Sequence, residues 1–393
     1  MSTFIRGGDL FALPKGTASQ SKTEAYRDVV ISDFVAKAFG GEVRDKVHGH
    51  ALQTIVNTQY GSGFNGGAID IATLHIRAIQ DYCKEHRLSF CGLFSDLSAA
   101  FPSIVRRLAV GNSITDCELC DRLKAIGFGP DMIVDTLHML RSLKVWEKAR
   151  TPKQLCAILR ETLGTTWFAM ESLSGATAYT SGTSAGTALA DIIFTVAFAA
   201  VLKSIRCNLE ALELIHSVEV PMGCFGETEF IHTKFQEISY ADDVVFPIVA
   251  DALTLVNKTI VTAEVILFEF SKFGLKMNLA PGKSSAVFDF RGPKSIEART
   301  KAERLEYIPI EAPNGTIAQL DRVSIQKHVG SKYVGGGALM PEIVFKVSKV
   351  NFRELAYVTR VLKNDNMKTV EKNALPKLSS FHECWCRQGP GPP

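Results

Sequence analysis

The chain has 393 residues, of which 46% are hydrophobic and 22% are charged, and its net charge is +3. These values are ordinary for a globular protein, and the length exceeds what one hydrophobic core usually holds, so we expect two or three subdomains. The nine cysteines are scattered through apolar runs and lack zinc-site spacing. They indicate reduced thiols in an intracellular protein of the nucleus or cytoplasm, and exclude a secreted disulfide framework.

The charge is distributed unevenly. Residues 322–377 carry eleven Lys or Arg and four Asp or Glu, a balance of +7, so the rest of the chain is mildly acidic. A basic C-terminal segment on an acidic body is typical of a protein that holds a phosphate backbone with one part. The most apolar stretch, 187–202, is too short to span a bilayer and contains Asp191, and residues 1–15 lack the apolar core of a signal peptide. We therefore expect neither secretion nor membrane insertion.

The N-terminal quarter offers little recognisable chemistry. Residues 1–20 are rich in Gly, Ser and Thr and are expected to be loose, and helical spacing begins after residue 33. The glycine-rich stretch 59–67 lacks the Gly-Lys-Ser/Thr ending of a P-loop, which excludes an ATPase of that type. A helix is expected over 69–82, helical patterns recur within 104–175, and residues 291–325 are expected to be irregular.

Two apolar strands end in carboxylates. The run Phe90 to Ser95 is followed by Asp96, and the run Ile238 to Ala241 is followed by Asp242 and Asp243. An Asp-Asp pair suits the tight turn of a β-hairpin, so both acids are expected at the tip, with 244–249 as the second strand. Carboxylates grouped at the edge of a hydrophobic sheet need a cation, which is the layout of a magnesium site for phosphoryl transfer. The alternative is a plain polar hairpin tip.

Five motifs in this order resemble those of reverse transcriptases, and their wording is closest to non-LTR (LINE-type) retrotransposons. The five stretches are Phe90 to Phe101, Gly182 to Phe194, Tyr240 to Asp243, Phe273 to Lys283 and Lys332 to Gly335. The resemblance implies an α+β right-hand polymerase with an antiparallel palm sheet, partial fingers and a helical thumb. The implied divisions are a loose segment over 1–20, partial fingers over 21–87, a palm over 88–335 with a helical insertion at about 104–175, a thumb over 336–380 and a disordered tail over 381–393.

The same resemblance implies RNA-directed DNA polymerisation by a two-metal mechanism. The partners would be an RNA template, a DNA primer and deoxynucleoside triphosphates, with no membrane; the sequence predicts no oligomeric state. Asp96 and Asp242 would hold two Mg²⁺ ions, for which Mn²⁺ could substitute, and Asp243 would complete the metal site.

A nucleotide site is implied as well. Arg27 would grip the triphosphate, with Lys22 as a helper, since a guanidinium suits forked phosphate recognition. Lys283 would lie near the triphosphate and could donate a proton to the leaving pyrophosphate. The simpler alternatives are a surface ion pair for Arg27 with Asp28 or Asp33, and a solvated loop for Lys283.

Three further residues of the implied nucleotide site act through shape. Gly182 and Gly186 would allow a turn and a close approach to the nucleotide. Phe101 would stack under the sugar and exclude a 2′-hydroxyl, which would select deoxynucleotides; a ring simply packed in the core is the alternative. Contacts with primer or template are implied for Tyr240, Lys332, Tyr333, Gly335, Lys346, Lys349 and Arg353, the last three on a helical basic face that could also be merely solvated.

The chain departs from the family pattern in two places. Ala185 stands where relatives usually have a Gln that positions the nascent base pair, and Pro102 stands where many carry an acid. No endonuclease domain is evident before residue 20 and no zinc knuckle after the thumb, so we expect a partial retrotransposon protein. Two alternatives stay open: a catalytically decayed retroelement fragment that only binds RNA, and a related palm polymerase such as an intron maturase or an RNA-templated RNA polymerase.

Overall fold

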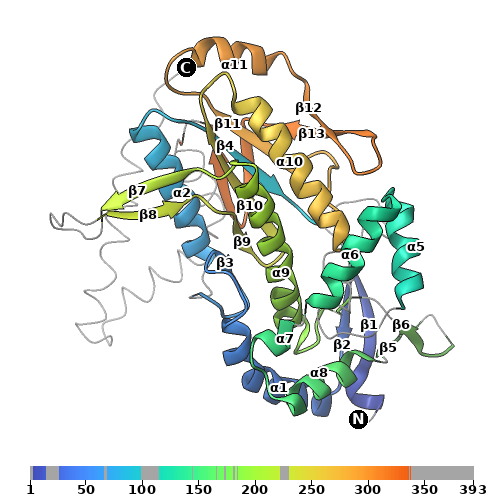
Figure 1. Ribbon diagram of the computed structural model, residues 1–393. Helices are drawn as coiled ribbons and strands as arrows, with labels where there is room; N and C mark the ends of the chain where they lie inside the picture. The colour runs from blue at the N-terminus through green and yellow to red at the C-terminus, as the bar shows by residue number, and fades with distance from the viewer. Residues whose placement is uncertain are drawn as a thin grey trace, which may run out of the picture. The chain divides into compact units, whose positions relative to one another are not determined.

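The computed structural model divides into two compact units, Met1–Ala338 and Leu339–Pro393 (Figure 1). The residues it describes all belong to the first unit: 3–14, 26–65, 69–98, 115–143, 145–164, 166–171, 174–179, 182–183, 185–221, 230–335 and 337. Apart from Gly337, the predicted thumb and tail lie outside these ranges.

A seven-stranded sheet organises the first unit, in the order β12-β13-β11-β4-β10-β9-β3. Most neighbours are antiparallel, whereas β3 with β9 and β11 with β13 are parallel. The predicted α+β class with a mainly antiparallel sheet is confirmed. The strands are β3 (Gln59–Tyr60), β4 (Ser89–Ser95), β9 (Ile238–Tyr240), β10 (Asp243–Ala250), β11 (Ser285–Asp289), β12 (Tyr307–Glu311) and β13 (Ile317–Arg322).

The two central strands, β4 and β10, are buried on both faces. Every residue of β4 is buried, as are six of the eight residues of β10. Their register runs from Val244 opposite Ser95 to Ala250 opposite Ser89. Because side chains alternate along a strand, Leu93 and Val244 enter one core cluster, and the neighbouring Phe94 and Val245 enter another.

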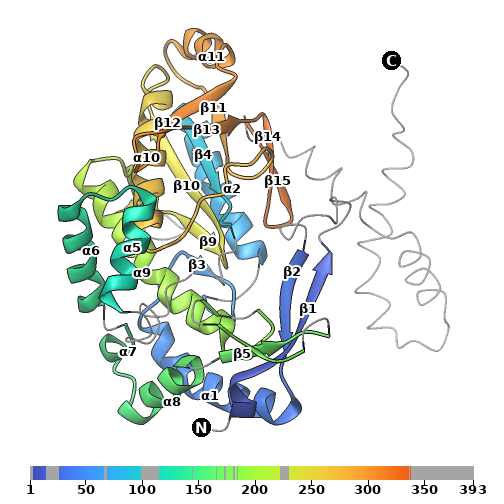
Figure 2. The same ribbon diagram turned by 90° about the vertical axis from the view of Figure 1, so that its right-hand side faces the viewer.

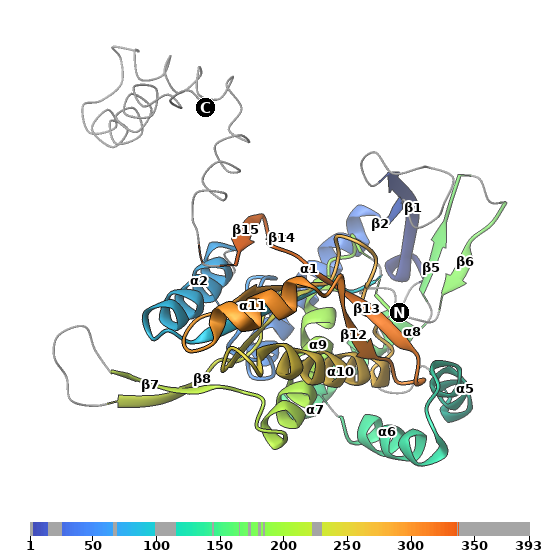
Figure 3. The same ribbon diagram turned by 90° about the horizontal axis from the view of Figure 1, so that it is seen from above.

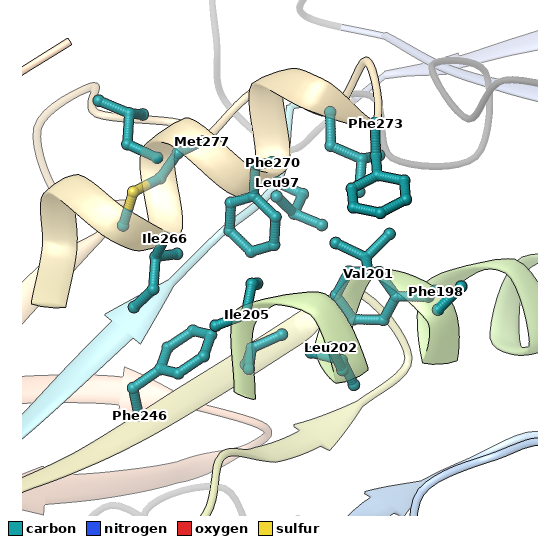
Figure 4. Packing of buried hydrophobic residues seen from close by; sticks show 14 of the residues in the cluster. Leu97, Phe198, Val201, Leu202, Ile205, Phe246, Ile266, Phe270, Phe273 and Met277 are labelled. Atoms are coloured by element: carbon teal, nitrogen blue, oxygen red, sulfur yellow. The ribbon is translucent and has the colours of Figure 1, made fainter. Parts of the chain in front are cut away.

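Two long helices, α9 (Ala190–Ala211) and α10 (Leu255–Lys272), cover one face of this sheet. Figure 4 shows the side chains of Phe198 and Ile205 from α9 packed with Phe270 from α10 and Phe246 from β10. With 22 residues, α9 is long and apolar enough to cross a membrane. The expectation that this apolar stretch is too short to span a bilayer was therefore wrong. Two thirds of its apolar window is nevertheless buried inside this core.

The other face is covered by α2 (Ile69–Glu85) and by the hairpin of β14 (Ile325–His328) and β15 (Ser331–Val334), which lies beside α2 in Figure 2. Ile76 and Ile79 of α2 are buried with Phe90 and Phe94 of β4. The helix predicted over 69–82 is therefore confirmed and continues for one more turn.

A second sheet has the order β2-β1-β5-β6 and includes the N-terminus. After the short helix η1 (Thr3–Arg6), β1 (Gly7–Pro14) pairs along its length with β2 (Tyr26–Ile31), so the expected loose segment over 1–20 was wrong for residues 3–14. A strand ladder with a distant partner gives this Gly-rich segment its order. The sheet is completed by β5 (Thr166–Ala169) and β6 (Thr177–Tyr179).

The expected irregular stretch over 291–325 was also wrong, because it contains α11 (Ser295–Glu303), β12 and β13. Four helices lie between Asp116 and Gly164, within the stretch where helical patterns were predicted. Figure 3 shows a two-stranded hairpin, β7 (Ser217–Pro221) with β8 (Phe230–Lys234), extending away from the central sheet. The remaining helices are α1 (Phe34–Leu52), α5 (Asp116–Ile126), α6 (Pro130–Ser142), α7 (Val145–Lys148) and α8 (Lys153–Gly164).

Candidate active site

The β9–β10 hairpin carries two of the three predicted acids. Its turn is Ala241-Asp242, and Asp243 is already the first residue of β10, paired with Tyr240. The turn therefore lies one residue earlier than expected. Ala241 has φ +54°, a left-handed conformation that residues other than glycine seldom adopt, and its N–H donates to the carbonyl of Tyr60 at 3.3 Å. The neighbouring strand β3 thus supports a strained turn that carries the acids.

Asp96 lies next to this hairpin. Continuing the register one step beyond Val244 and Ser95 brings Asp243 beside Asp96, on the same face as Val245 and Phe94. Burial, followed by the charges of the nearby Asp242 and Asp96 carboxylates, raises the pKa of Asp243 to about 6, and Lys283 opposes this shift. The structure therefore brings the three predicted acids and Lys283 together at one edge of the sheet.

The fourth motif wraps around Asp96. The Lys283 ammonium lies 3.7 Å from Oδ2 of Asp96, and the Asn278 amide donates to the same oxygen at 2.7 Å. The hydroxyl of the fully buried Ser284 accepts the N–H of Asp96 at 3.0 Å. Asn278 and Ser284 were not predicted as site residues. The signal available in the sequence was the place of Asn278 inside the fourth motif and of Ser284 directly after its Lys283.

The chemistry of these donors fits a hard divalent cation. Carboxylate oxygens are the ligands that Mg²⁺ prefers, and a cation would relieve the repulsion that raises the pKa of Asp243. In the part of the chain that the structure describes, no group of three or more His, Cys, Asp or Glu side chains is arranged to hold a metal ion. Binding would therefore require these three carboxylates to turn further toward one another.

The third motif packs against strand β2. Gly186 has φ +97°, and a Cβ there would lie 2.5 Å from the carbonyl oxygen of Val30. The carbonyl of Ala185 accepts the Val30 N–H at 2.8 Å, and Gly182 also has a positive φ, +67°. The close approach that Gly186 permits is thus with β2, while contact of either glycine with a nucleotide stays a prediction.

The structure describes only part of the predicted triphosphate-binding group. The backbone of Arg27 belongs to β2, opposite Leu13, and the same strand is bonded to the third motif through Val30. The side chain of Arg27 lies outside the described part of the structure, as do Lys22 and Phe101. Their roles remain predictions.

The β14–β15 hairpin corresponds to the predicted primer grip, but its tyrosine is not available to a primer. Tyr333 has no exposed surface, and its ring lies 5.4 Å from that of Phe94. His328, also buried, packs against Phe94 at 5.1 Å, and burial lowers the pKa of His328 to about 3. The predicted direct contact by Tyr333 is therefore corrected to a packing role that anchors the hairpin.

The other residues predicted to contact primer or template differ in their surroundings. Lys332 and Tyr240 are half-buried, and Gly335 passes so close to β11 that a Cβ would lie 2.3 Å from the carbonyl oxygen of Phe288. Gly335 is thus required by packing. Lys346, Lys349 and Arg353 lie outside the described residues.

A buried ion pair that was not predicted stands just before β9. Arg206 of α9 donates to Glu237 at 2.6 Å and to the hydroxyl of Thr58 at 3.0 Å. Glu237 is 3% exposed, and burial raises its pKa, which the contact with Arg206 opposes. This pair joins α9, the segment before β3 and the acid-bearing hairpin. Nothing in the sequence distinguishes it from surface charges.

Comparison of the sequence with known protein families and with curated proteins finds no match. Comparison of the fold finds solved polymerases. One is the insertion-loop deletion mutant of the RNA-dependent RNA polymerase of a human picobirnavirus, with 11% identity, a TM-score of 0.36, and coverage of 72% of this chain and 42% of that chain. Another is apo telomerase from Candida tropicalis truncated from its C-terminal domain, with 11% identity, a TM-score of 0.42, and coverage of 81% and 56%.

Telomerase from Candida albicans, in complex with a fragment of telomeric RNA, is similar at 10% identity and a TM-score of 0.38, with coverage of 86% of this chain and 47% of that chain. This chain spans about half the length of the structures it matches.

Proposed function

We propose that this chain is a template-directed nucleotidyltransferase of the reverse transcriptase type, which extends a DNA primer on an RNA template. The observation that carries the proposal is the meeting of Asp96, Asp242 and Asp243. Asp96 follows one strand, and Asp242 and Asp243 lie where the antiparallel neighbour of that strand begins; burial, together with the charges of Asp242 and Asp96, raises the pKa of Asp243 to about 6. Lys283 lies beside them.

The proposed chemistry follows from these residues. Two Mg²⁺ ions, when bound, would stabilise the attacking and leaving oxygens of the phosphoryl transfer. Asp96 and Asp242 would hold them, and Asp243 would complete the site. The Lys283 ammonium is 52% exposed and lies 3.7 Å from Asp96, and it would neutralise charge on the triphosphate and donate a proton to the leaving pyrophosphate.

The finer parts of the proposal concern substrate and origin. The order and wording of the five motifs support a LINE-type retrotransposon source. Phe101 would reject ribonucleotides, and Arg27 with Lys22 would grip the triphosphate. The +7 balance over 322–377 supports phosphate contacts with the primer–template duplex.

A second candidate is an RNA-binding protein that has lost catalysis. Ala185 favours it, because a methyl group replaces an amide that would hold the templating base. The structure gives this alternative no further support: the acids remain together, and the turn at Ala185 remains bonded to β2.

Primer extension tests the proposal. The full chain would be given a primed RNA template, Mg²⁺ and either deoxynucleoside or ribonucleoside triphosphates. Extension with deoxynucleotides supports a reverse transcriptase, and extension with ribonucleotides alone replaces it with an RNA-templated RNA polymerase. Binding of the template without extension by either supports the RNA-binding alternative.

A further inference from the structure

The carboxylate of Asp96 is held on one side only. Asn278 Nδ2 donates to Oδ2 at 2.7 Å, and Lys283 Nζ lies 3.7 Å from the same oxygen. Among the residues that the structure describes, no hydrogen-bond donor is placed on Oδ1 of Asp96. One oxygen is therefore held by two side chains, whereas the other has no hydrogen-bond donor among the described residues.

The orientation of the Asn278 amide is determined by its other end. Its Oδ1 accepts the backbone N–H of Ala280 at 3.2 Å, so the nitrogen of the amide must be the end that faces Asp96. The Asn278 N–H donates to the carbonyl of Asp96 at 2.8 Å, and the Asn278 carbonyl accepts the Ser284 N–H at 3.0 Å. Backbone and side chain of Asn278 are thus both fixed against the strand end that carries Asp96.

Asn278 and Lys283 differ in what a metal ion would do to them. A bound divalent cation repels the Lys283 ammonium, and an incoming triphosphate attracts it, so this long and half-exposed side chain is suited to leave Asp96. The Asn278 amide is neutral and rigidly held, so neither ion displaces it. Of the two described side chains at Oδ2, Asn278 is therefore the one suited to keep this oxygen in place throughout a catalytic cycle.

We propose that Asn278 is a positioning residue for Asp96: it fixes Oδ2 and so presents Oδ1 to the divalent cation. The inference rests on the proposed function, because it assumes that Asp96 is a metal ligand. It assigns a role to a residue of the fourth motif besides Lys283. Residues that orient metal ligands by hydrogen bonding typically contribute about 10- to 100-fold to metal affinity or activity.

The test measures metal binding without catalysis. Mn²⁺ would be titrated into the full chain without nucleic acid and followed by electron paramagnetic resonance, and loss of the signal change in Asp96→Asn would identify this site. Asn278→Ala should weaken Mn²⁺ binding about 10-fold. Asn278→Gln, which keeps an amide donor, should recover part of the loss. Asn257→Ala, at an exposed position of α10, is the matched control and should bind like the parent.

Primer extension gives the second readout. The Mg²⁺ concentration for half-maximal extension should rise with Asn278→Ala, while the rate at saturating Mg²⁺ should change less. Parent-like Mn²⁺ binding by Asn278→Ala would overturn the positioning role, whatever happens to activity. A parent that binds Mn²⁺ through Asp96 but extends no primer would contradict the proposed function and leave the role of Asn278 standing. A parent that binds no Mn²⁺ would overturn the positioning role directly.

Discussion

Arg77 of α2 lies over the ring of Tyr333 of β15, with its guanidinium carbon 4.7 Å from the ring centroid. Arg77 also donates to the carbonyl of Lys332, and Tyr333 contacts Phe94, two residues before Asp96. A continuous row of side chains therefore connects α2, the β14–β15 hairpin and the strand that ends in an acid. Cation–π and aromatic pairs of this kind contribute about 0.5–2 kcal/mol each.

The first prediction concerns this row. Tyr333→Ala should lower the free energy of unfolding by about 3–5 kcal/mol, because it removes a fully buried ring. Tyr333→Phe keeps the ring and should change stability by less than about 1.5 kcal/mol. Urea denaturation of the three proteins measures both. If Tyr333→Phe has normal stability but binds primer–template poorly, Tyr333 contacts the primer directly and is not only a packing residue.

The second prediction concerns Asp242. Asp242→Asn keeps the shape of the hairpin turn but removes a charged ligand, so primer extension should fall by several orders of magnitude while primer–template binding stays nearly intact. Asp251→Asn, at an exposed position after the other end of β10, is the control and should retain activity. Gel-based extension and fluorescence anisotropy measure the two properties. Undiminished extension by Asp242→Asn would remove the three-acid metal site from consideration.

The third prediction is a pH dependence without metal. The pKa of Asp243 is about 6 in the folded chain against 3.8 as its ordinary value, so between these values the folded state keeps a proton that the unfolded state has released. Stability should therefore fall as pH rises from about 4 to about 6, and the loss should persist above that. Since one pKa unit corresponds to about 1.4 kcal/mol and Asp243 is partly exposed, we expect a loss of about 1–2 kcal/mol.

Two comparisons isolate this effect. Asp243→Asn has no proton to release, so it should be more stable than the parent at pH 8 and similar to it at pH 4. Mg²⁺ should stabilise the parent at pH 8 more than it stabilises the variant, because the cation favours the charged carboxylates. Melting curves with and without Mg²⁺ at both pH values provide the data, and equal slopes with pH for parent and variant would count against a raised pKa.

The acids could be predicted from sequence because their signal is local. A buried strand that ends in Asp96 and a hairpin with two adjacent acids each reveal themselves within ten residues, and alternation along the strands then places Asp96 and Asp243 on one face. The order of β1 could not be predicted, because its hydrogen bonds are made with β2, beyond an intervening stretch of sequence. A Gly-rich segment is predicted to be loose when the strand that pairs with it is not known.

Burial and hydrogen bonding at the site also could not be predicted from the neighbouring sequence. The local sequence around Tyr333 is compatible with a ring that faces a primer and with one that faces a core. The packing of α2 against β15 shows that the ring is buried. Asn278 bonds Asp96 across 182 positions of sequence, and Arg206 bonds Glu237 across 31. Polar residues of this kind look like ordinary surface residues until the fold brings their partners to them.

The fourth prediction concerns the basic segment 322–377. If it binds the duplex through phosphates, affinity should fall steeply with salt and depend little on sequence. Neutralising Lys346, Lys349 and Arg353 together should reduce the salt slope by up to about three phosphate contacts. Neutralising Lys46 and Lys301, two exposed lysines of the first unit paired with Glu42 and Glu297, is the control. An unchanged slope in the triple variant would mean that the basic face is only solvated.

The last prediction decides between a working polymerase and its RNA-binding alternative, and it concerns Ala185. The backbone here is held by the bond from Val30 to the Ala185 carbonyl, and the side chain is half-buried, so Ala185→Gln should place an amide without moving the turn. A missing hydrogen bond to the templating base costs about 0.5–1.5 kcal/mol, which is roughly a two- to twelve-fold effect rather than an inactivation. The parent should therefore extend primers with reduced fidelity or processivity, and Ala185→Gln should improve it. The measurement is extension length and misincorporation on an RNA template. Gly186→Ala is a contrasting variant: it forces a Cβ against Val30 and should shorten the extension products and increase misincorporation. If the parent extends nothing and Ala185→Gln rescues nothing, while RNA is still bound, the chain is an RNA-binding protein that has lost its catalytic activity.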